Sequence, residues 1–385
     1  MNNLFVKQFE FNQTVIESRS PEHDSLLDGN LSLCYYYAFL YKMTNVEKYR
    51  DAAFRLIEEV FNAINKNEAR LYGSSYASGI AGFAYTTTIV NEILDLGIDL
   101  HDELFDLDGY LMESLMLDLK SDKLDCLHSG FGIVHYFITR TNKNSNDVIK
   151  AICNKAKITS EGLWFENIVE SESKDRNVAN LSTAHGLTGM LLILLNSLEY
   201  TEHKLLVEET IKEGVRFILN NSIANKPSNE RGNFYSKINF NNNTFEMYPR
   251  LAWCYGDLGV IVLLYKCHAY FNNADYKTIA DRAGLSTINN RSKELSWVDD
   301  PFFCHGSSGV SMMYKVLYKY SNIPQYKESQ QFWINKTLDF FKNINTSHDI
   351  YQKKHSTIDG LLGVNLSIAS NLNDSNDDWL SMFFL

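Results

Sequence analysis

Proline is scarce in this chain, which has only 5 prolines among 385 residues. Because proline interrupts helices and removes a backbone donor, so few of them favour a helix-rich protein. Long apolar runs are also absent. The longest aliphatic run is MLLILL at 190–195, whereas a membrane-spanning helix needs roughly 20 apolar residues. The sequence therefore predicts a helical protein without a membrane-spanning segment.

Clusters of basic residues are missing as well. Lys and Arg total 36 against 47 Asp and Glu, so the formal net charge is -11. Phosphate binding needs clustered Lys and Arg, and we therefore expect no nucleic-acid partner. The start, MNNLFVKQFEF, lacks the basic-then-apolar order of a secretory signal, and the 6 cysteines are scattered. We expect a cytoplasmic protein with reduced cysteines.

A short turn motif recurs along the chain, as pairs of glycines three residues apart that precede an apolar run. Ser32 replaces the second glycine in the first copy, and Ser129 replaces the first glycine in the third. The motifs start at residues 29, 79, 129, 186, 256, 306 and 360. One such motif is weak, but seven at near-regular spacing indicate a repeat architecture.

Each repeat is predicted to hold two helices. The segment after the turn is apolar on most faces, as in TGMLLILLNSL, and should be buried. The segment before the next turn is amphipathic, as in NVEKYRDAAFRLIEEVFNAINK and HKLLVEETIKEGVRFILNNS, and should face solvent. Seven buried helices ringed by seven amphipathic ones predict an all-α fold, a closed α/α toroid. We expect one domain over residues 1–385, with an Asn-rich inserted loop near 222–248.

An open solenoid is the alternative architecture. Solenoids usually need polar caps at their ends. The terminal repeats here keep apolar inner helices, LCYYYAFLY and VNLSIA, and this favours closure.

Reactive side chains gather just before the first turn position in repeats three to six. They are His128, with Asp125 three residues earlier; His185; Tyr255 after Cys254; and His305 after Cys304. Equivalent positions in a ring converge in space. We therefore expect these side chains to lie at one end of the ring, where His185 becomes a candidate acid or base.

Two of these turns carry the side chains of a catalytic zinc site. Cys254, Cys304 and His305 would supply three ligands and leave a fourth tetrahedral position open. Thiolates select zinc over magnesium or calcium, and zinc keeps an incoming thiol ionised near neutral pH. Each cysteine alone would be interpreted as a small buried hydrophobe. The shared register of the two turns favours zinc instead.

Other polar and cysteine residues have simpler interpretations. Cys34, Cys153 and the Cys267-His268 pair are expected to be structural, and metal binding by Cys126 and His128 is the weaker interpretation. Asp28 and Asp359, which precede their turn glycines, are expected to cap helices.

The motifs AHGLTG, WCYGDLG and CHGSSG resemble those of the lanthionine synthetase C-like family, the bacterial lantibiotic cyclases. The resemblance covers all seven repeats and implies a seven-layered α/α barrel that binds Zn²⁺ through Cys254, Cys304 and His305. It further implies that a cysteine thiol of a precursor peptide adds to dehydroalanine or dehydrobutyrine, forming lanthionine or methyllanthionine rings. Proton transfer would fall to His185. Departures from the family pattern are Ser129 and Leu258.

The resemblance implies further catalytic residues. They are Asp125, Arg250 (four residues before Cys254) and Tyr255. The substrate would be a dehydrated precursor peptide with leader and core. The chain is too short to include a dehydratase domain, so the resemblance implies a stand-alone cyclase acting with a separate dehydratase and a transporter. Peripheral association with the inner face of the membrane would follow from that complex.

Three rival functions stay open. A prenyltransferase-like zinc enzyme also activates a peptide thiol, but usually with Asp, Cys and His ligands and a partner subunit. A non-catalytic member of the same fold could bind zinc, thiols or peptides without closing rings. A carbohydrate-active toroid would need paired carboxylates, and Asp28, Asp125 and Asp359 are available.

Overall fold

The computed structural model describes residues 2–140, 144–168, 176–223, 232–342, 344–373 and 377–385. Helices dominate, with a few short strands. The contacts divide the chain into two compact units. Unit 1 comprises Met1–Leu111, Asp300–Ser311 and Gln331–Ser381, and unit 2 comprises Met112–Asp299, Met312–Gln330 and Met382–Leu385. The single domain over 1–385 stays a prediction.

Seven helices of the described chain begin at the residue directly after a predicted turn position. They are α2 (Asn30–Thr44), α4 (Ile80–Leu94), α7 (Gly130–Arg140), α9 (Leu187–Leu195), α11 (Asp257–Phe271), α14 (Ser307–Ser321) and α16 (Leu361–Leu372). Every residue of α9 is buried, as its apolar sequence predicted. The turn register and the burial of these helices are thus confirmed.

A second set of helices lies before the first turn and between successive turns. They are α1 (Asn2–Glu17), α3 (Glu47–Asn65), α6 (Phe105–Ser121), α8 (Asn144–Cys153), α10 (Lys204–Asn220), α12 (Ala274–Thr287) and α15 (Pro324–Phe340). In α3 the buried positions are Tyr49, Ala53, Leu56, Ile57 and Val60, which form one stripe at helical spacing. The predicted amphipathic character of α3 is confirmed, and α10 also buries one face and exposes the other.

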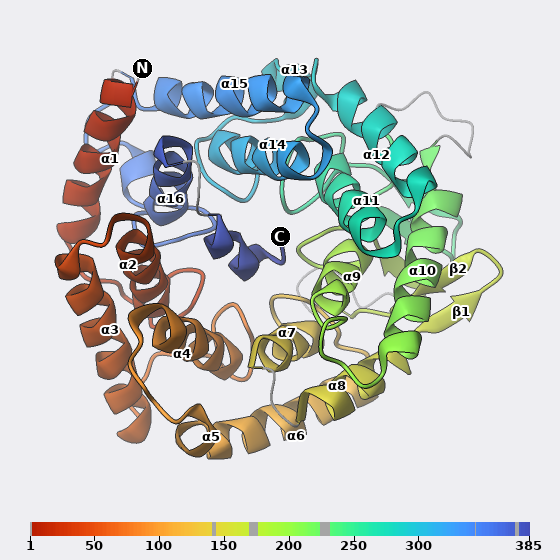
Figure 1. Ribbon diagram of the computed structural model, residues 1–385, viewed down its shortest axis with the longest axis horizontal. Coiled ribbons are helices and arrows are strands. Elements are labelled where there is room, and N and C mark those ends of the chain that lie inside the picture. Colours follow the sequence, from red (N-terminus) through yellow and green to blue (C-terminus); the bar gives the residue numbers. More distant parts are fainter. Residues whose placement is uncertain (1, 141–143, 169–175, 224–231, 343, 374–376) are drawn as a thin grey trace. The chain divides into compact units, whose positions relative to one another are not determined.

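Unit 1 brings the first and last repeats together. Helix α2 packs against α3, α4 and α16, and α1 packs against α16 (Figure 1). The Thr357 N–H donates to the Leu27 carbonyl at 3.1 Å, and the N–H groups of Leu26 and Leu27 donate to the Ala77 carbonyl at 3.1 Å. Backbone hydrogen bonds therefore join the turns of repeats seven, one and two. A closed ring requires this of its terminal repeats, whereas an open solenoid does not provide it.

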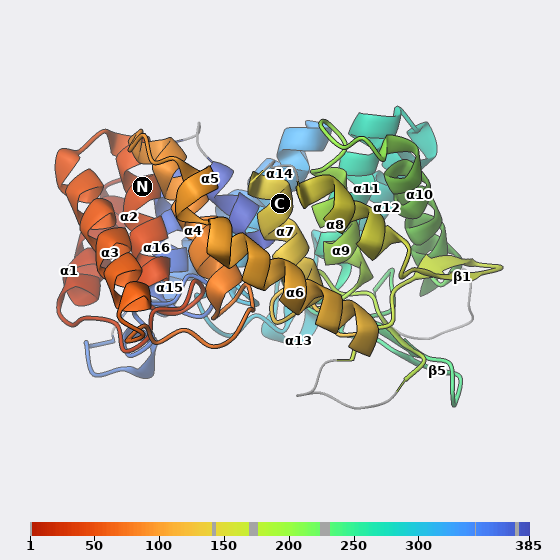
Figure 2. The same cartoon turned by 90° about the horizontal axis from the view of Figure 1, so that it is seen from below.

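Unit 2 combines helices with two small antiparallel sheets. Helix α9 packs against α7, α10 and α11, and α11 packs against α12. One sheet pairs β1 (Lys157–Thr159) with β2 (Gly162–Trp164), and the other has the order β3 (Val178–Asn180), β4 (Lys237–Asn239), β5 (Thr244–Glu246). The β1–β2 hairpin and β5 extend beyond the helices of this unit (Figure 2).

The segment predicted as an inserted loop near 222–248 lies partly outside the described residues, at 224–231. Its remainder contains β4, which pairs with β3 through Ile238 opposite Ala179, and β5, which pairs with β4. Because β3 ends at Asn180, this sheet supports the chain that leads to the repeat-four turn at His185. Short helices α5 (Leu100–Glu103), α13 (Lys293–Ser296), η2 (Asp349–Tyr351) and η3 (Asp378–Phe383) complete the described elements.

No helix within the described ranges is long and apolar enough to cross a bilayer.

Candidate functional site

The turn before α11 depends on a glycine at its first position. Gly256 has φ +98°, a conformation that side-chain-bearing residues rarely adopt, and a Cβ there would lie 2.3 Å from the Arg250 carbonyl oxygen. Only glycine allows the chain to fold back this tightly. The turn thereby fixes the positions of Cys254 and Tyr255 immediately before it.

Backbone hydrogen bonds join the turns of repeats four and five within unit 2. The N–H groups of Thr183 and Ala184 donate to the Cys254 carbonyl at 3.1 and 3.3 Å. The rings of His185 and Tyr255 lie 6.2 Å apart between centroids. The equivalent positions of these two repeats therefore lie together, as the repeat register predicted.

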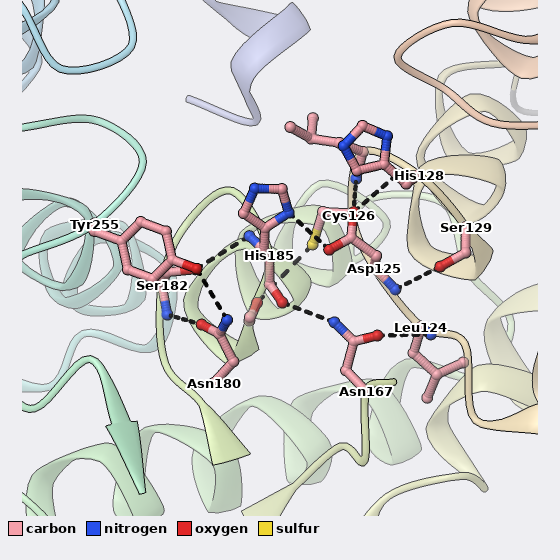
Figure 3. Close-up of polar contacts among 12 residues, drawn as sticks. Leu124, Asp125, Cys126, His128, Ser129, Asn167, Asn180, Ser182, His185 and Tyr255 are labelled. Carbon is pink, nitrogen blue, oxygen red and sulfur yellow. Dashed lines mark hydrogen bonds and ion pairs between the residues drawn. The ribbon is translucent and has the colours of Figure 1, made fainter. Parts of the chain in front are cut away.

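An ion pair links the turns of repeats three and four. The Nδ1 of His185 lies 2.8 Å from Oδ2 of Asp125 (Figure 3). The other carboxylate oxygen of Asp125 accepts the backbone N–H groups of Leu127 and His128 at 2.9 and 2.8 Å. Asp125 is only 1% exposed. Both oxygens are thus occupied, and the carboxylate holds the imidazole in one orientation.

The charge of Asp125 is stabilised by its neighbours. Burial by itself would raise the pKa of Asp125, but the hydrogen bond and positive charge of His185, with help from His128, outweigh burial and hold that pKa below its ordinary value. Burial lowers the pKa of His128, although Asp125 opposes this effect. The site therefore contains an ionised aspartate close to two imidazoles.

Two asparagine side chains, which the sequence analysis did not identify, form hydrogen bonds that position the site residues. Asn167 donates from Nδ2 to the His185 carbonyl at 2.8 Å and accepts from the Leu124 N–H at 3.0 Å, so it joins the two turns (Figure 3). Asn180 donates to the Tyr255 hydroxyl at 3.2 Å and accepts from the Ser182 N–H at 2.9 Å. The Asn167 segment lies outside the turn register, which explains why the repeat pattern could not identify it.

A second imidazole lies beside His185. The rings of His128 and His185 stack with centroids 5.7 Å apart and an interplanar angle of 16°. The ligand atoms of Asp125, His128 and His185 lie within 4.8 Å of one another. Asp125 is already fully engaged by His185 and by two backbone N–H groups. Cys126, two residues before His128, is buried with a raised thiol pKa and is structural.

The Cys-His pair that precedes α14 lies in unit 1. The Cys304 N–H donates to the Ile358 carbonyl at 2.9 Å, so the strand-like segment before α16 positions this cysteine. The Nε2 of His305 lies 3.3 Å from Oδ2 of Asp300. An imidazole held by a carboxylate at Nε2 presents the Nδ1 lone pair to a metal, the usual arrangement for ligating histidines. Asp300 is a further residue that sequence reasoning missed.

Cys254 in unit 2 and Cys304 and His305 in unit 1 are candidate metal ligands by residue type. Two thiolates and one imidazole are the donor set that zinc prefers. The orientation of His305 by Asp300 also fits a metal ligand. The residues present are therefore compatible with zinc.

The remaining sequence candidates have plain structural settings. The guanidinium of Arg250 donates to the Trp297 carbonyl at 3.3 Å, and its Nε is buried without a hydrogen-bond partner. No hydrogen bond or ion pair within the described chain joins Arg250 to Asp125.

Burial raises the pKa of the Cys34 thiol above its ordinary value. It also raises the pKa of the Cys153 thiol to about 11 and that of the Cys267 thiol to about 12. Such thiols are unreactive, which agrees with a structural role.

Comparisons with known proteins identify the family and the fold of this chain. The profile of the family described as "Lanthionine synthetase C-like protein" matches residues 20–384. No curated protein matches the chain significantly by sequence. A solved structure titled "Nisin cyclase" matches with a TM-score of 0.71 at 16% identity, over 99% of this chain and 96% of that one. This match confirms the predicted all-α toroid fold. The profile spans almost the whole sequence, and the chain therefore belongs to the lanthionine synthetase C-like family.

Proposed function

We propose that this protein is a zinc-dependent cyclase that forms lanthionine or methyllanthionine rings in a dehydrated precursor peptide. The observation that carries the proposal is the Asp125–His185 pair, on a turn whose Thr183 and Ala184 N–H groups bind the Cys254 carbonyl. A proton-transfer pair is thereby joined by the backbone to a candidate metal ligand. Family membership and the fold support the same conclusion.

Cys254, Cys304 and His305 would hold the zinc, with His305 oriented by Asp300. These residues would place zinc where it would supply Lewis acidity, which would lower the pKa of a peptide cysteine and favour its thiolate near neutral pH.

His185 would supply the proton that completes the reaction. The peptide sulfur bonds to the β-carbon of the dehydro residue, and the π electrons move to the α-carbon and its carbonyl as an enolate. That enolate then takes a proton at the α-carbon, so the reaction is an isomerisation with no net loss of atoms. With Nδ1 held by Asp125, the Nε2 of His185 is the atom that carries this proton.

Tyr255 and Arg250 would stabilise the developing negative charge. The Tyr255 hydroxyl is oriented by Asn180, and its ring lies near that of His185. The buried Nε of Arg250 is a donor with no protein partner in the described chain, so it remains able to donate to substrate. Hydrogen-bond donors aimed at an enolate oxygen lower the barrier to its formation.

The substrate and the cellular setting belong to the same proposal. The substrate would be a precursor peptide with leader and core, dehydrated by a separate enzyme and exported by a transporter. The cyclase would act in the cytoplasm or, through such a complex, at the inner face of the membrane.

A thiol-blocking assay tests the proposal. Purified protein is incubated with a synthetic peptide that contains one cysteine and one dehydroalanine, and free thiols are then alkylated. Ring closure leaves the peptide mass unchanged and prevents alkylation. We expect ring closure with the wild-type protein but not with the Cys304→Ala variant. His101→Asn, a change at an exposed histidine, is the matched control. A protein that binds zinc and peptide but never blocks the thiol would be the non-catalytic alternative.

A further inference from the structure

The short helix α13 in unit 2 ends at a tryptophan with an unusual backbone conformation. Trp297 follows this helix with φ 56° and ψ 26°, in the left-handed region. The other non-glycine residues of positive φ in the described chain are Asn or Asp, apart from the buried Phe384. This conformation is unfavourable for a bulky side chain, and glycine or asparagine is usual where a helix ends. The end of the helix therefore does not explain why a tryptophan stands here.

Trp297 also differs from the other tryptophans in its exposure to solvent. It is 45% exposed, whereas none of the other four tryptophans exceeds 4%. Its chain neighbours Ser296 and Val298 are buried, and the Ser296 Oγ accepts the Val298 N–H at 3.3 Å. Buried residues on both sides thus fix the backbone of Trp297, while its indole remains accessible to a ligand.

Hydrogen bonds connect this position to the candidate functional site. The Arg250 guanidinium donates to the Trp297 carbonyl at 3.3 Å, and the Leu251 N–H donates to the Ser296 carbonyl at 2.9 Å. Leu251 lies four residues before Tyr255, one of the proposed catalytic residues. The exposed indole is therefore attached to the segment that carries part of the proposed reaction site.

A second exposed aromatic side chain lies on that segment. Tyr248 is 36% exposed, and its ring centroid lies 5.2 Å from that of Tyr255. The Tyr255 ring lies in turn 6.2 Å from the ring of His185. Exposed aromatic surface therefore accompanies the proposed proton donor within unit 2, and aromatic side chains of this kind are typical of surfaces that bind peptides.

We propose that Trp297 is a substrate-binding residue whose indole packs against an apolar side chain of the precursor peptide. The inference deepens the proposed function and rests on it, because the peptide that meets Arg250 and Tyr255 is the partner of the indole. The indole offers a large, rigid apolar surface at little cost in side-chain entropy. Lys293 and Asp299 pair with each other at 3.4 Å, and Arg250 adds a positive charge. An apolar peptide side chain therefore fits this position better than a cationic one.

Acrylamide quenching of tryptophan fluorescence on the zinc-loaded full-length protein tests this contact, because Trp297 is the one exposed tryptophan of the five. The probes are acetylated, amidated glycine heptapeptides with a central cysteine flanked on both sides by leucine, alanine or lysine. We expect the leucine peptide to protect Trp297 from acrylamide and to bind with a Kd about fivefold lower than the alanine peptide. The lysine peptide should bind no better than the alanine peptide.

Substitutions at Trp297 separate the indole from the turn that holds it. Trp297→Gly fits the left-handed conformation and removes the ring, so the preference for leucine should be lost. Trp297→Phe keeps an aromatic ring and should retain part of the preference. The control is Tyr110→Ala, which removes a side chain of similar exposure (43%) from helix α6 and should leave the preference intact. Thermal melts of the same samples show whether each variant is folded.

The proposal is overturned if leucine gives no advantage over alanine, whether all peptides bind equally or none binds. It is also overturned if the lysine peptide binds more tightly than the leucine peptide, if Trp297 stays equally accessible to acrylamide, or if Trp297→Gly keeps the preference. The thiol-blocking assay on its dehydroalanine peptide reports separately on the proposed function. Absence of ring closure by wild type would contradict that function, whereas ring closure without a leucine preference contradicts only the role of Trp297.

Discussion

The imidazole Nδ1 of His185 lies 2.8 Å from the Asp125 carboxylate, across 60 residues of sequence. The two residues precede the turns of neighbouring repeats, and the side chain of Asn167 hydrogen-bonds to the backbone of both turns. The carboxylate holds Nδ1, so Nε2 is the nitrogen left for proton transfer in the proposed reaction. In that proposal, this relationship would make His185 the general acid.

Replacing His185 by asparagine removes the proton donor but keeps a polar side chain of similar size. We expect ring closure to slow by about 10²- to 10⁴-fold, the usual contribution of general acid–base catalysis. Zinc content should stay at the wild-type level, because His185 is not among the proposed ligands. Thiol-blocking rates at saturating peptide measure the effect, and unchanged rates would remove His185 from the mechanism.

Asp125→Asn tests the ionised carboxylate through pH. The folded pKa of Asp125 lies below its unfolded value of about 3.9, so its charge stabilises the fold above that pH. The stabilisation is lost as pH falls through the folded pKa. At pH 7 the variant should lose about 1–3 kcal/mol of unfolding free energy, and the difference from wild type should shrink below about pH 4. Denaturant unfolding at several pH values checks this, with the exposed Asp275→Asn as control. If the difference in unfolding free energy between wild type and Asp125→Asn did not change with pH, an ionised, stabilising Asp125 would be contradicted.

Asn167→Ala should disturb catalysis from a distance. Removing its side chain leaves the His185 carbonyl and the Leu124 N–H without their shared partner, at an expected cost of about 1–3 kcal/mol in stability. Because the His185 turn loosens, kcat should fall while zinc binding is retained. The control is Asn220→Ala, which removes an exposed amide hydrogen bond to Glu161. Equal effects of the two variants on kcat would argue against a positioning role for Asn167.

Gly256→Ala should disrupt the turn that carries Cys254. The substitution forces a side chain into φ +98° and against the Arg250 carbonyl, and we expect more than about 1 kcal/mol of destabilisation together with weaker zinc retention. Gly109→Ala is the matched control, since no atom lies within 4 Å of the added methyl group in helix α6. That change should be neutral or slightly stabilising. Thermal melts and zinc analysis measure both variants, and a stable, zinc-replete Gly256→Ala protein would refute the expected strain.

Much of the fold could be predicted because the turn glycines have a strict steric function. Where an added Cβ would clash with a carbonyl oxygen, as at Gly256, only glycine fits, and the glycine therefore identifies the turn in the sequence. The inner helix begins directly after that turn. The same register places His185 beside Cys254, because equivalent positions of adjacent repeats hydrogen-bond to each other.

Features outside the register could not be predicted. Asn167 and Asn180 act through hydrogen bonds whose partners are distant in sequence, and an asparagine in an extended segment has no distinguishing pattern. Strands β4 and β5 are only three residues each, and their polar sequence suggested a loop. They are ordered by pairing, since β4 adds to β3 and β5 adds to β4. Asp28 and Asp359 were expected to be helix caps, but the glycine turn separates each carboxylate from the helix start.

The proposed zinc centre of Cys254, Cys304 and His305 is tested most directly by the metal content of the purified protein. Elemental analysis of wild type should give about one zinc per chain, and the Cys254→Ala variant should lose it. Wild type purified without chelators that contains no zinc, or a variant that retains it fully, would contradict the account.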